Sequence, residues 1–222
     1  MTAPGPFDSA SAFRRHARNV LHREPPVLET CTETILKSPG DFDLNPPSAE
    51  ELALVRPDRL RPAAVLIPVI ARTPLSVLLT VRSDRLPSHA GQISFPGGKL
   101  EADDAGPAAA AMREAREEVG LESQFIEPVG YLDWYRTSSG YVISPLVALV
   151  QPGYDLRPDP GEVAEIFEVP LRFLLDAGNH RRHSRIWRGR QRHFHAVLYE
   201  ERYIWGITAG IIKNLHERLT GS

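Results

Sequence analysis

The sequence has little cysteine, no long apolar run and almost no net charge. Cys31 is its single cysteine, so no disulfide forms within the chain, as is typical of proteins in a reducing cytoplasm. The longest apolar runs, 63–71 and 145–150, are too short to span a bilayer, and the N-terminus lacks the apolar core of a signal peptide. A formal net charge of −2 gives no strong attraction to nucleic acid or anionic membranes. We therefore expect a cytoplasmic protein without a nucleic-acid or membrane partner.

The first 60 residues differ from the rest of the chain. Apolar positions at helical spacing predict an amphipathic helix over 7–21, which packs on the domain, forms a dimer contact or covers the substrate. The chain from there to residue 60 is rich in Pro, Asp and Glu, and predicts an irregular wrap with a short helix over 48–55 capped by Ser48. We expect residues 1–60 to form an N-terminal appendage and residues 61–222 to form the main domain.

Apolar and β-branched runs after residue 60 predict the elements of the main domain. One helix begins near Pro107 and ends at Gly120, residue types that suit those two ends. The predicted strands are 63–71, 75–82, 92–95, 129–135, 141–150, 186–188 and 193–199, and the other predicted helices are 171–176 and 203–212. This order favours an α/β fold with a mixed sheet. Three aromatic residues near one turn pack in the core or stack on an adenine ring: Trp134, Tyr135 and Tyr141.

The predicted helix that ends at Gly120 carries three carboxylates on one side. Glu114, Glu117 and Glu118 stand at i, i+3 and i+4, where like charges destabilise a helix by a few tenths of a kcal/mol per pair. A divalent cation would turn this repulsion into binding, and oxygen ligands at this density suit Mg²⁺ or Mn²⁺. The alternative is a solvated acidic face with partial arginine partners. The spacing alone leaves both interpretations open.

The residues around these glutamates resemble a known motif. Gly98, the acidic loop after it and the run REAREEVGL at 113–121 resemble the Nudix box, a glycine, a loop acid and R-E-U-x-E-E-x-G-U with U apolar. One extra residue between the glycine and the arginine places the loop acid at Asp104, or at Glu101 if the loop is rearranged. The resemblance implies a Nudix hydrolase with an α/β/α sandwich around a central mixed sheet.

A second motif precedes the box without a gap. The runs LLTVRS at 78–83 and HAGQISFPGG at 89–98 resemble the motif of the coenzyme A diphosphatase branch, which also tolerates the longer box. The runs EVAEIFEVPL at 162–171 and IWGITAGII at 204–212 resemble later segments of the same branch. The resemblance implies hydrolysis of coenzyme A or its derivatives to 3′,5′-ADP and 4′-phosphopantetheine, or its acyl form.

The resemblance also implies roles for individual residues. The metal ligands would be Glu114, Glu117 and Glu118 with the Gly98 carbonyl, holding Mg²⁺ or Mn²⁺, and Arg113 would orient them. Glu162 is the first candidate for a further catalytic glutamate, as a ligand or general base, and Glu165 is the second. Residues expected to contact the substrate are Arg82, His89, Gly97, Gly98 and Lys99. Arginine suits phosphate because its planar fork contacts two oxygens at once.

Two other functions stay open from the sequence. One is a Nudix hydrolase of another substrate, such as ADP-ribose or a dinucleotide. The other is a non-catalytic Nudix module that binds a nucleotide or a partner, although such modules usually lose the box glutamates and all three are present here. The basic segment 180–195 is interpreted as a basic edge; contact with the 3′-phosphate of coenzyme A and RNA binding are its alternatives.

Overall fold

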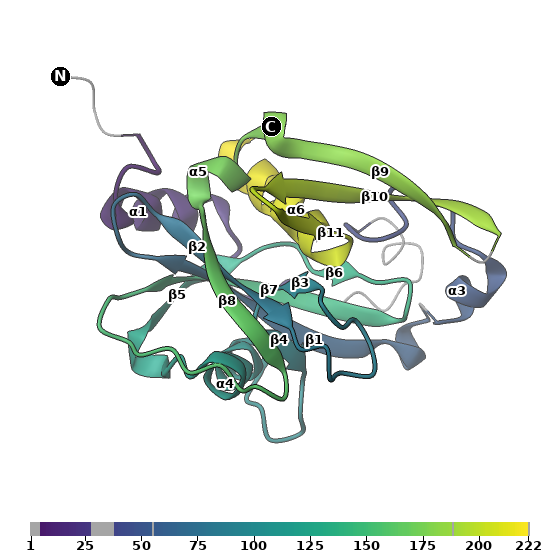
Figure 1. Ribbon diagram of the computed structural model, residues 1–222, viewed down its shortest axis with the longest axis horizontal. Helices are drawn as coiled ribbons and strands as arrows, with labels where there is room; N and C mark the ends of the chain where they lie inside the picture. The colour runs from purple at the N-terminus through teal and green to yellow at the C-terminus, as the bar shows by residue number, and fades with distance from the viewer. Residues whose placement is uncertain (1–4, 28–37, 55, 188, 222) are drawn as a thin grey trace.

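A computed structural model describes residues 5–27, 38–54, 56–187 and 189–221 (Figure 1). Cys31 lies outside these residues, as do position 55 of the predicted short helix and Arg188 of the predicted hairpin. Within the described ranges no helix combines the length and apolarity needed to cross a membrane.

The larger of two sheets has eight strands in the order β3-β2-β1-β7-β5, with β4 also paired to β1, β6 to β7 and β8 to β2. β1 and β7 are parallel, from Arg61 opposite Tyr141 to Ile70 opposite Val150, and the other pairs are antiparallel. The predicted mixed sheet is therefore confirmed. Its strands are β1 (Arg61–Ile70), β2 (Ser76–Arg82), β3 (Ile93–Ser94), β4 (Gly97–Lys99), β5 (Ile126–Tyr131), β6 (Tyr135–Arg136), β7 (Tyr141–Val150) and β8 (Val163–Pro170).

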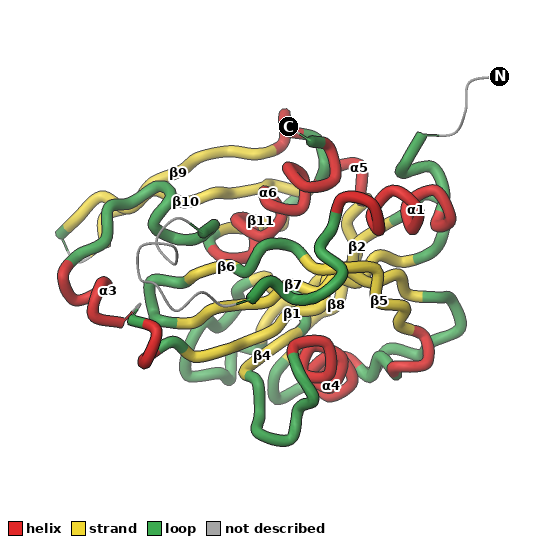
Figure 2. Tube along the Cα trace, turned by 180° about the vertical axis from the view of Figure 1, so that it is seen from behind, coloured by secondary structure: helices red, strands yellow, loops and turns green. Residues whose placement is uncertain are grey.

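Helices cover both faces of this sheet. On one face, α4 (Pro107–Val119) packs its alanines and Val119 against inward-facing residues of the sheet such as Leu66 and Leu146. The opposite face is covered by α1 (Ala10–Val20), α5 (Leu171–Leu174) and α6 (Ile207–Thr220), with Phe13, Ile67 and Leu215 in one buried cluster. Figure 2 shows α4 on one side of the strands and α1 and α6 on the other. The α/β/α sandwich expected from the sequence is thus the observed fold.

A separate three-stranded sheet follows the last strand of the large one. It has the order β11-β10-β9, with β9 (His180–Trp187), β10 (Arg190–Tyr199) and β11 (Arg202–Trp205) all antiparallel. β9 and β10 are longer than the predicted hairpin and include most of the basic segment. The first half of this segment lies on β9, which is an edge strand, and the second half lies mostly on β10, the middle strand.

Three predictions of secondary structure were wrong. The helix predicted over 203–212 begins only at Ile207, because 202–205 pairs with β10 and Gly206 then turns the chain with a φ of 67°. The strand predicted over 129–135 begins at Ile126 and stops at Tyr131, after an irregular register beside Pro128. Residues 163–170, for which no strand was predicted, form β8, because pairing along β2 outweighs the glutamates within this segment.

The N-terminal segment is attached to the main domain by specific contacts. α1 begins after Ser9, whose side chain accepts the N–H of Ala12, and its Arg14 forms a two-point ion pair with Glu127 of β5 at 2.7 and 2.6 Å. The short helix α3 (Ala49–Leu54) begins after Ser48, the predicted cap, which exchanges hydrogen bonds with Glu51. The apolar face of α1 is therefore packed on its own domain.

Further contacts attach the described residues after α1 to the main domain. Asn45 donates to the carbonyl of His193 and accepts its N–H, each at 2.8 Å, so residues 40–51 are fastened to β10. His22, Asn214 and Arg218 all contact the Asp133 carboxylate, which joins the end of α1 to α6. Three single-turn 3₁₀ helices complete the described elements: Pro57–Arg59, Ser123–Phe125 and Ala177–Asn179.

Candidate active site

Helix α4 begins and ends at residue types that favour helix termini. Pro107 is its first residue, where the missing N–H leaves no hydrogen bond unmade. Gly120 follows the helix with a φ of 70° and donates its N–H to the carbonyl of Arg116 at 3.0 Å. Ala115 and Val119 are fully buried against the sheet. With this face fixed, the glutamates emerge along the flank of α4 that packs beside β4.

The three glutamates of α4 lie at different depths. The side chain of Glu118 is 4% exposed and that of Glu114 is 16% exposed, whereas that of Glu117 is 50% exposed. Two carboxylates therefore face inward and the third stands at the rim. The predicted cluster is thus a graded one that runs from the interior to solvent.

Glu118 is the most perturbed of these groups. Its Oε2 accepts the N–H of Gly97 at 3.3 Å, and its Oε1 lies 3.9 Å from Nη1 of Arg82. Burial, together with the charges of Glu114 and Glu162, outweighs these two contacts and raises the pKa of Glu118 to about 8. A buried carboxylate with so few contacts that stabilise its negative charge is typical of a site that binds a cation or moves a proton.

At two positions of β4, neighbouring atoms lie so close to the backbone that a side chain would collide with them. A Cβ on Gly98 would lie 2.3 Å from Oε1 of Glu114, and a Cβ on Gly97 would lie 2.4 Å from the carbonyl oxygen of Ala64. The first contact is with a carboxylate end and the second is with the backbone of β1, which pairs with β4. The paired glycines therefore let β4 lie between the central strand and Glu114.

Arg113 binds the acidic groups around it. It donates to both oxygens of Asp104 at 3.1 and 3.0 Å, and to Glu114 and Glu117 at 3.0 Å each. The pKa of Asp104 is lowered by these bonds, while that of Glu114 is raised by burial in spite of Arg113. Glu101 lies 3.9 Å from the guanidinium with a side chain 66% exposed. Of the two loop acids left open by the sequence, Asp104 is the partner of Arg113.

The two candidate glutamates of the 162–171 segment have different surroundings. The charge of Glu162 contributes to the raised pKa values of Glu114 and Glu118, so it shares their electrostatic environment. Glu165 forms an ion pair with Arg202 of β11, and its side chain is half exposed. The geometry therefore favours Glu162 over Glu165 as a member of the site.

The donor set fits a hard divalent cation. Glu114, Glu117, Glu118 and Glu162 repel one another, and the Gly98 carbonyl adds a neutral oxygen on the adjacent strand. Across the described residues, no three carboxylate, imidazole or thiol side chains have already converged on one point. Glutamates on one helix flank have the side-chain freedom to converge on a cation. Assignment of these residues as ligands stays a prediction.

The residues predicted to contact the substrate lie at two places. Arg82, Gly97 and Gly98 lie beside the glutamates, and the buried Nε of Arg82 has no hydrogen-bond partner in the described structure. Lys99 is exposed, and its carbonyl accepts a bond from Arg113 at 3.1 Å. His89 is also exposed, and its Nδ1 lies 2.9 Å from Oε1 of Gln92. His89 and Gln92 line a separate cavity.

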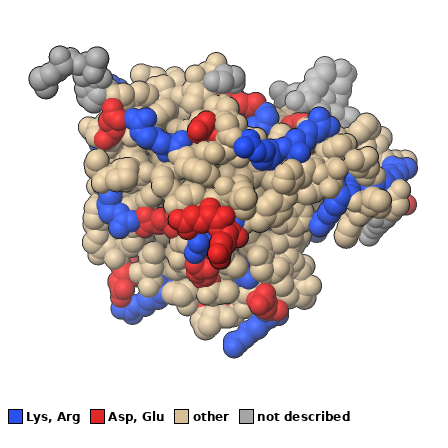
Figure 3. Space-filling model, turned by 45° about the horizontal axis from the view of Figure 1, so that its top comes forward, with Lys and Arg blue, Asp and Glu red and all other residues tan. Residues whose placement is uncertain are grey.

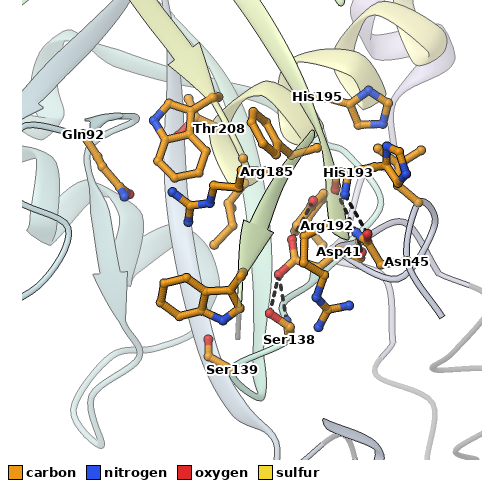
Figure 4. Close-up of a pocket in the computed structure, with 18 of the residues that line it drawn as sticks. Asp41, Asn45, Gln92, Ser138, Ser139, Arg185, Arg192, His193, His195 and Thr208 are labelled. Atoms are coloured by element: carbon orange, nitrogen blue, oxygen red, sulfur yellow. Dashed lines mark hydrogen bonds between the residues drawn. The ribbon is translucent and has the colours of Figure 1, made fainter. Parts of the chain in front are cut away.

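This cavity, of about 400 Å³, was not predicted from the sequence (Figure 4). It is lined by residues of the 40–51 segment, His89 and Gln92, the start of β6 and the turn after it, strands β9, β10 and β11, and the start of α6. Tyr135 lines it, while Trp134 and most of Tyr135 are buried, so these two aromatics belong mainly to the core. The sequence signal that was missed is Arg185 and Trp187 at i and i+2, which puts both side chains on one face of a strand.

Side chains of both charge signs are present on the surface. On the face shown in Figure 3, Lys and Arg side chains stand in separate groups with Asp and Glu among them. Three of the arginines, Arg181, Arg182 and Arg185, come from the single edge strand β9. The basic segment 180–195 continues from β9 into β10.

Comparison with known proteins gives a consistent set of relatives. A family model described as the NUDIX domain matches residues 59–188. A protein of Photorhabdus laumondii named "Uncharacterized Nudix hydrolase NudL" is 40% identical over 174 residues, covering 78% of this chain and 91% of that protein. The protein of the same name from Escherichia coli K12 is 40% identical over 155 residues, covering 70% of this chain and 81% of its own length.

Solved structures give weaker matches. A Caenorhabditis elegans Ap4A hydrolase binary complex has a TM-score of 0.43 at 18% identity, over 51% of this chain and 82% of that one. The NUDIX domain of Shewanella oneidensis NrtR, complexed with ADP ribose, has a TM-score of 0.41 at 19% identity, over 58% and 86%.

Proposed function

The chain belongs to the Nudix hydrolase family, and from this premise we propose that it hydrolyses the diphosphate bond of coenzyme A or its derivatives. The products would be 3′,5′-ADP and 4′-phosphopantetheine, or its acyl form. The proposal rests on the LLTVRS and HAGQISFPGG runs, which resemble the coenzyme A branch of the family. The proposed partner is thus a small molecule. Three other expectations stay predictions: a cytoplasmic location, a possible homodimer and a domain boundary at residue 60.

One observation carries the proposal. Glu118 of the box is contacted by Gly97 at 3.3 Å and approached by Arg82 at 3.9 Å, and both of these residues belong to the two upstream runs. Residues of the upstream motif and of the box helix therefore meet at one buried carboxylate. This meeting is what a shared site for catalysis and substrate recognition requires.

A divalent cation, Mg²⁺ or Mn²⁺, is the proposed cofactor, held by Glu114, Glu117, Glu118 and the Gly98 carbonyl. When bound, it would offset the negative charge of the diphosphate and stabilise the charge that develops during hydrolysis. Family membership supports a divalent metal in general, and the choice between the two ions rests on the oxygen donor set.

The chain's own residues would divide the remaining tasks. The Arg82 guanidinium, whose Nε is buried without a partner in the described structure, would bind a phosphate oxygen. Glu162 would take the proton of the attacking water, because it lies in the field of the buried glutamates while Glu165 is paired with Arg202. Arg113 would hold Glu114 and Glu117 in orientation without touching substrate.

Three residues would contribute at the margins of the site. Gly97 and Gly98 would let the backbone of β4 approach the substrate closely, since any side chain there collides with its neighbours. The exposed Lys99 would meet phosphate from the solvent side, as a flexible point charge.

Product analysis by chromatography tests the proposal. Purified protein is incubated with coenzyme A, acetyl-coenzyme A, ADP-ribose and NADH, each with Mg²⁺ and with EDTA, beside the Glu118→Gln variant. We expect 3′,5′-ADP from coenzyme A, no product with EDTA, and a rate at least about a hundredfold lower in the variant, because it loses a proposed ligand of the cation. Circular dichroism of the variant controls for its fold.

The possible outcomes separate the alternatives. Turnover of ADP-ribose or NADH in place of coenzyme A would keep Nudix hydrolysis and contradict the substrate. Near-normal activity in the Glu118→Gln variant would remove Glu118 from the site. Absence of turnover with all four compounds would favour a nucleotide-binding module.

A further inference from the structure

The cavity beside His89 offers an unusual combination of aromatic rings and positive charge. Two of the chain's three tryptophans, Trp187 and Trp205, line it together with Phe194. The guanidinium carbon of Arg185 lies 4.5 Å from the ring centre of Trp205 and 5.3 Å from that of Trp187. A guanidinium held over indole rings is positioned by them without losing its charge.

Arg185 is the cation of the cavity that remains available to a ligand. Within the described ranges, no carboxylate lies at ion-pair distance from it. The other arginine of the lining, Arg192, is paired with Glu51. The remaining carboxylate, Asp41, accepts hydrogen bonds from Tyr135 at 3.1 Å and from the N–H and hydroxyl of Ser138 at 2.8 and 3.0 Å.

One imidazole of the lining, that of His195, carries no charge at neutral pH. Burial and, to a smaller extent, the charge of Lys213 together lower the pKa of His195 to about 4, so this ring is neutral. The N–H and carbonyl of His193 are both bound by Asn45. In the view of Figure 4, the Arg185 guanidinium lies on the Gln92 side of the cavity, away from Asp41 and Asn45.

A short chain of contacts connects this cavity with the glutamates. Gln92 lines the cavity, and its carbonyl accepts the N–H of Arg82 at 2.9 Å. The N–H of Gly91 in turn donates to the carbonyl of Arg82 at 3.0 Å. Because the Arg82 guanidinium approaches Glu118, one residue spans the space between the cavity wall and the proposed catalytic carboxylates.

We propose that this cavity binds the nucleotide end of the diphosphate substrate, with its base against the tryptophan rings and its phosphate monoester on Arg185. The inference rests on the proposed function, since the occupant is the part of that substrate that does not react. The volume of about 400 Å³ lies within the range of about 300–1,000 Å³ that small-molecule pockets have. Aromatic side chains are the usual platform for a base, and arginine is the usual partner of a phosphate.

The first test measures binding without catalysis. Tryptophan fluorescence is titrated with 3′,5′-ADP in EDTA, because two of the three tryptophans line the cavity. We expect saturable quenching and a Kd about tenfold higher in Arg185→Ala, because a charge-assisted hydrogen bond is lost. Arg190→Ala, on the same hairpin but outside the lining, is the matched control and keeps the wild-type Kd. Equal Kd values in wild type and Arg185→Ala would overturn the assignment.

The second test separates this inference from the proposed function. With coenzyme A and Mg²⁺, Arg185→Ala raises KM about tenfold and changes kcat less, and 3′,5′-ADP inhibits wild type competitively. Turnover of coenzyme A with an unchanged KM in Arg185→Ala, or noncompetitive inhibition, would refute the cavity while leaving the activity. Arg185-dependent binding of 3′,5′-ADP without turnover of coenzyme A would refute that substrate and support a nucleotide site.

Discussion

Replacing Gly98 with alanine tests whether Glu114 belongs to the metal site. The new Cβ would lie 2.3 Å from Oε1 and 2.6 Å from Cδ of Glu114, closer than side chains approach one another, so the carboxylate has to turn away. Its hydrogen bond from Arg113, 3.0 Å long, would be lost or redirected. Misorienting a metal ligand in this way costs about 10–100-fold in activity or metal affinity. The displaced group is the end of a flexible side chain, so the free energy of unfolding changes by about 1 kcal/mol or less.

The neighbouring glycine provides a matched control with the opposite outcome. A Cβ on Gly97 would meet the carbonyl oxygen of Ala64 at 2.4 Å and Cα of Val65 at 2.6 Å, which are backbone atoms of the central strand. Gly97→Ala therefore lowers the free energy of unfolding by about 1–3 kcal/mol or more, as overpacking does.

The assay combines urea unfolding with rates of coenzyme A hydrolysis over a series of Mg²⁺ concentrations. Gly98→Ala should fold with near-normal stability, turn over about 10–100-fold more slowly and need more Mg²⁺ for half-maximal rate. A Gly98→Ala protein with wild-type rate and wild-type Mg²⁺ dependence would refute the placement of Glu114 as a ligand.

Two further substitutions probe the catalytic base and the attachment of the N-terminal segment. Glu162→Gln lowers kcat by about 10²–10⁴-fold, the usual contribution of a general base, while Glu165→Gln leaves kcat near wild type in the same assay; the reverse result would exchange their roles. Asp133→Asn lowers the free energy of unfolding by about 1–3 kcal/mol at pH 7, because hydrogen bonds led by Arg218 outweigh burial and hold the pKa of Asp133 well below its usual range. This stabilisation is present above the unfolded pKa of about 3.9 and is lost as pH falls through the lower folded pKa, so urea curves of the two proteins converge in acid. Asp155→Asn, at a carboxylate that is 76% exposed, is the control and changes stability by about 0.5 kcal/mol or less; a gap for Asp133→Asn that persists in acid would contradict the reasoning.

The parts of the fold that sequence predicts are those determined by local chemistry. Helix α4 begins at Pro107 and ends before Gly120, as the end preferences of these residues require, and the glutamates follow from its periodicity. β8 was missed because pairing with β2 overrides the glutamates in its sequence. Residues 203–205 of β11 fall within the helix predicted over 203–212, because their partner strand, β10, is recognised only once the hairpin is known.

In the candidate site, too, the sequence predicts the contacts that lie within one helix and does not predict those between distant segments. Arg113 and its glutamates come from one helix, so their proximity follows from spacing. The choice of Asp104 over Glu101 depends on how a loop closes, which spacing leaves open and the bond lengths decide. The cavity around Arg185 is assembled from segments far apart in the chain, so no local pattern indicates it.

The parallel pairing of β1 with β7 has a consequence for how the protein folds. Arg61 pairs opposite Tyr141, and the whole of α4 lies in the loop that this pairing closes. Closing so long a loop costs chain entropy before any contact between the strands can compensate, which makes such pairing a slow step. α4 can form earlier from local contacts, but it has no surface to pack on until β1 and β7 meet. We therefore expect the glutamates to be present on a nascent helix well before they become an active site, so binding competence is acquired late on the folding pathway.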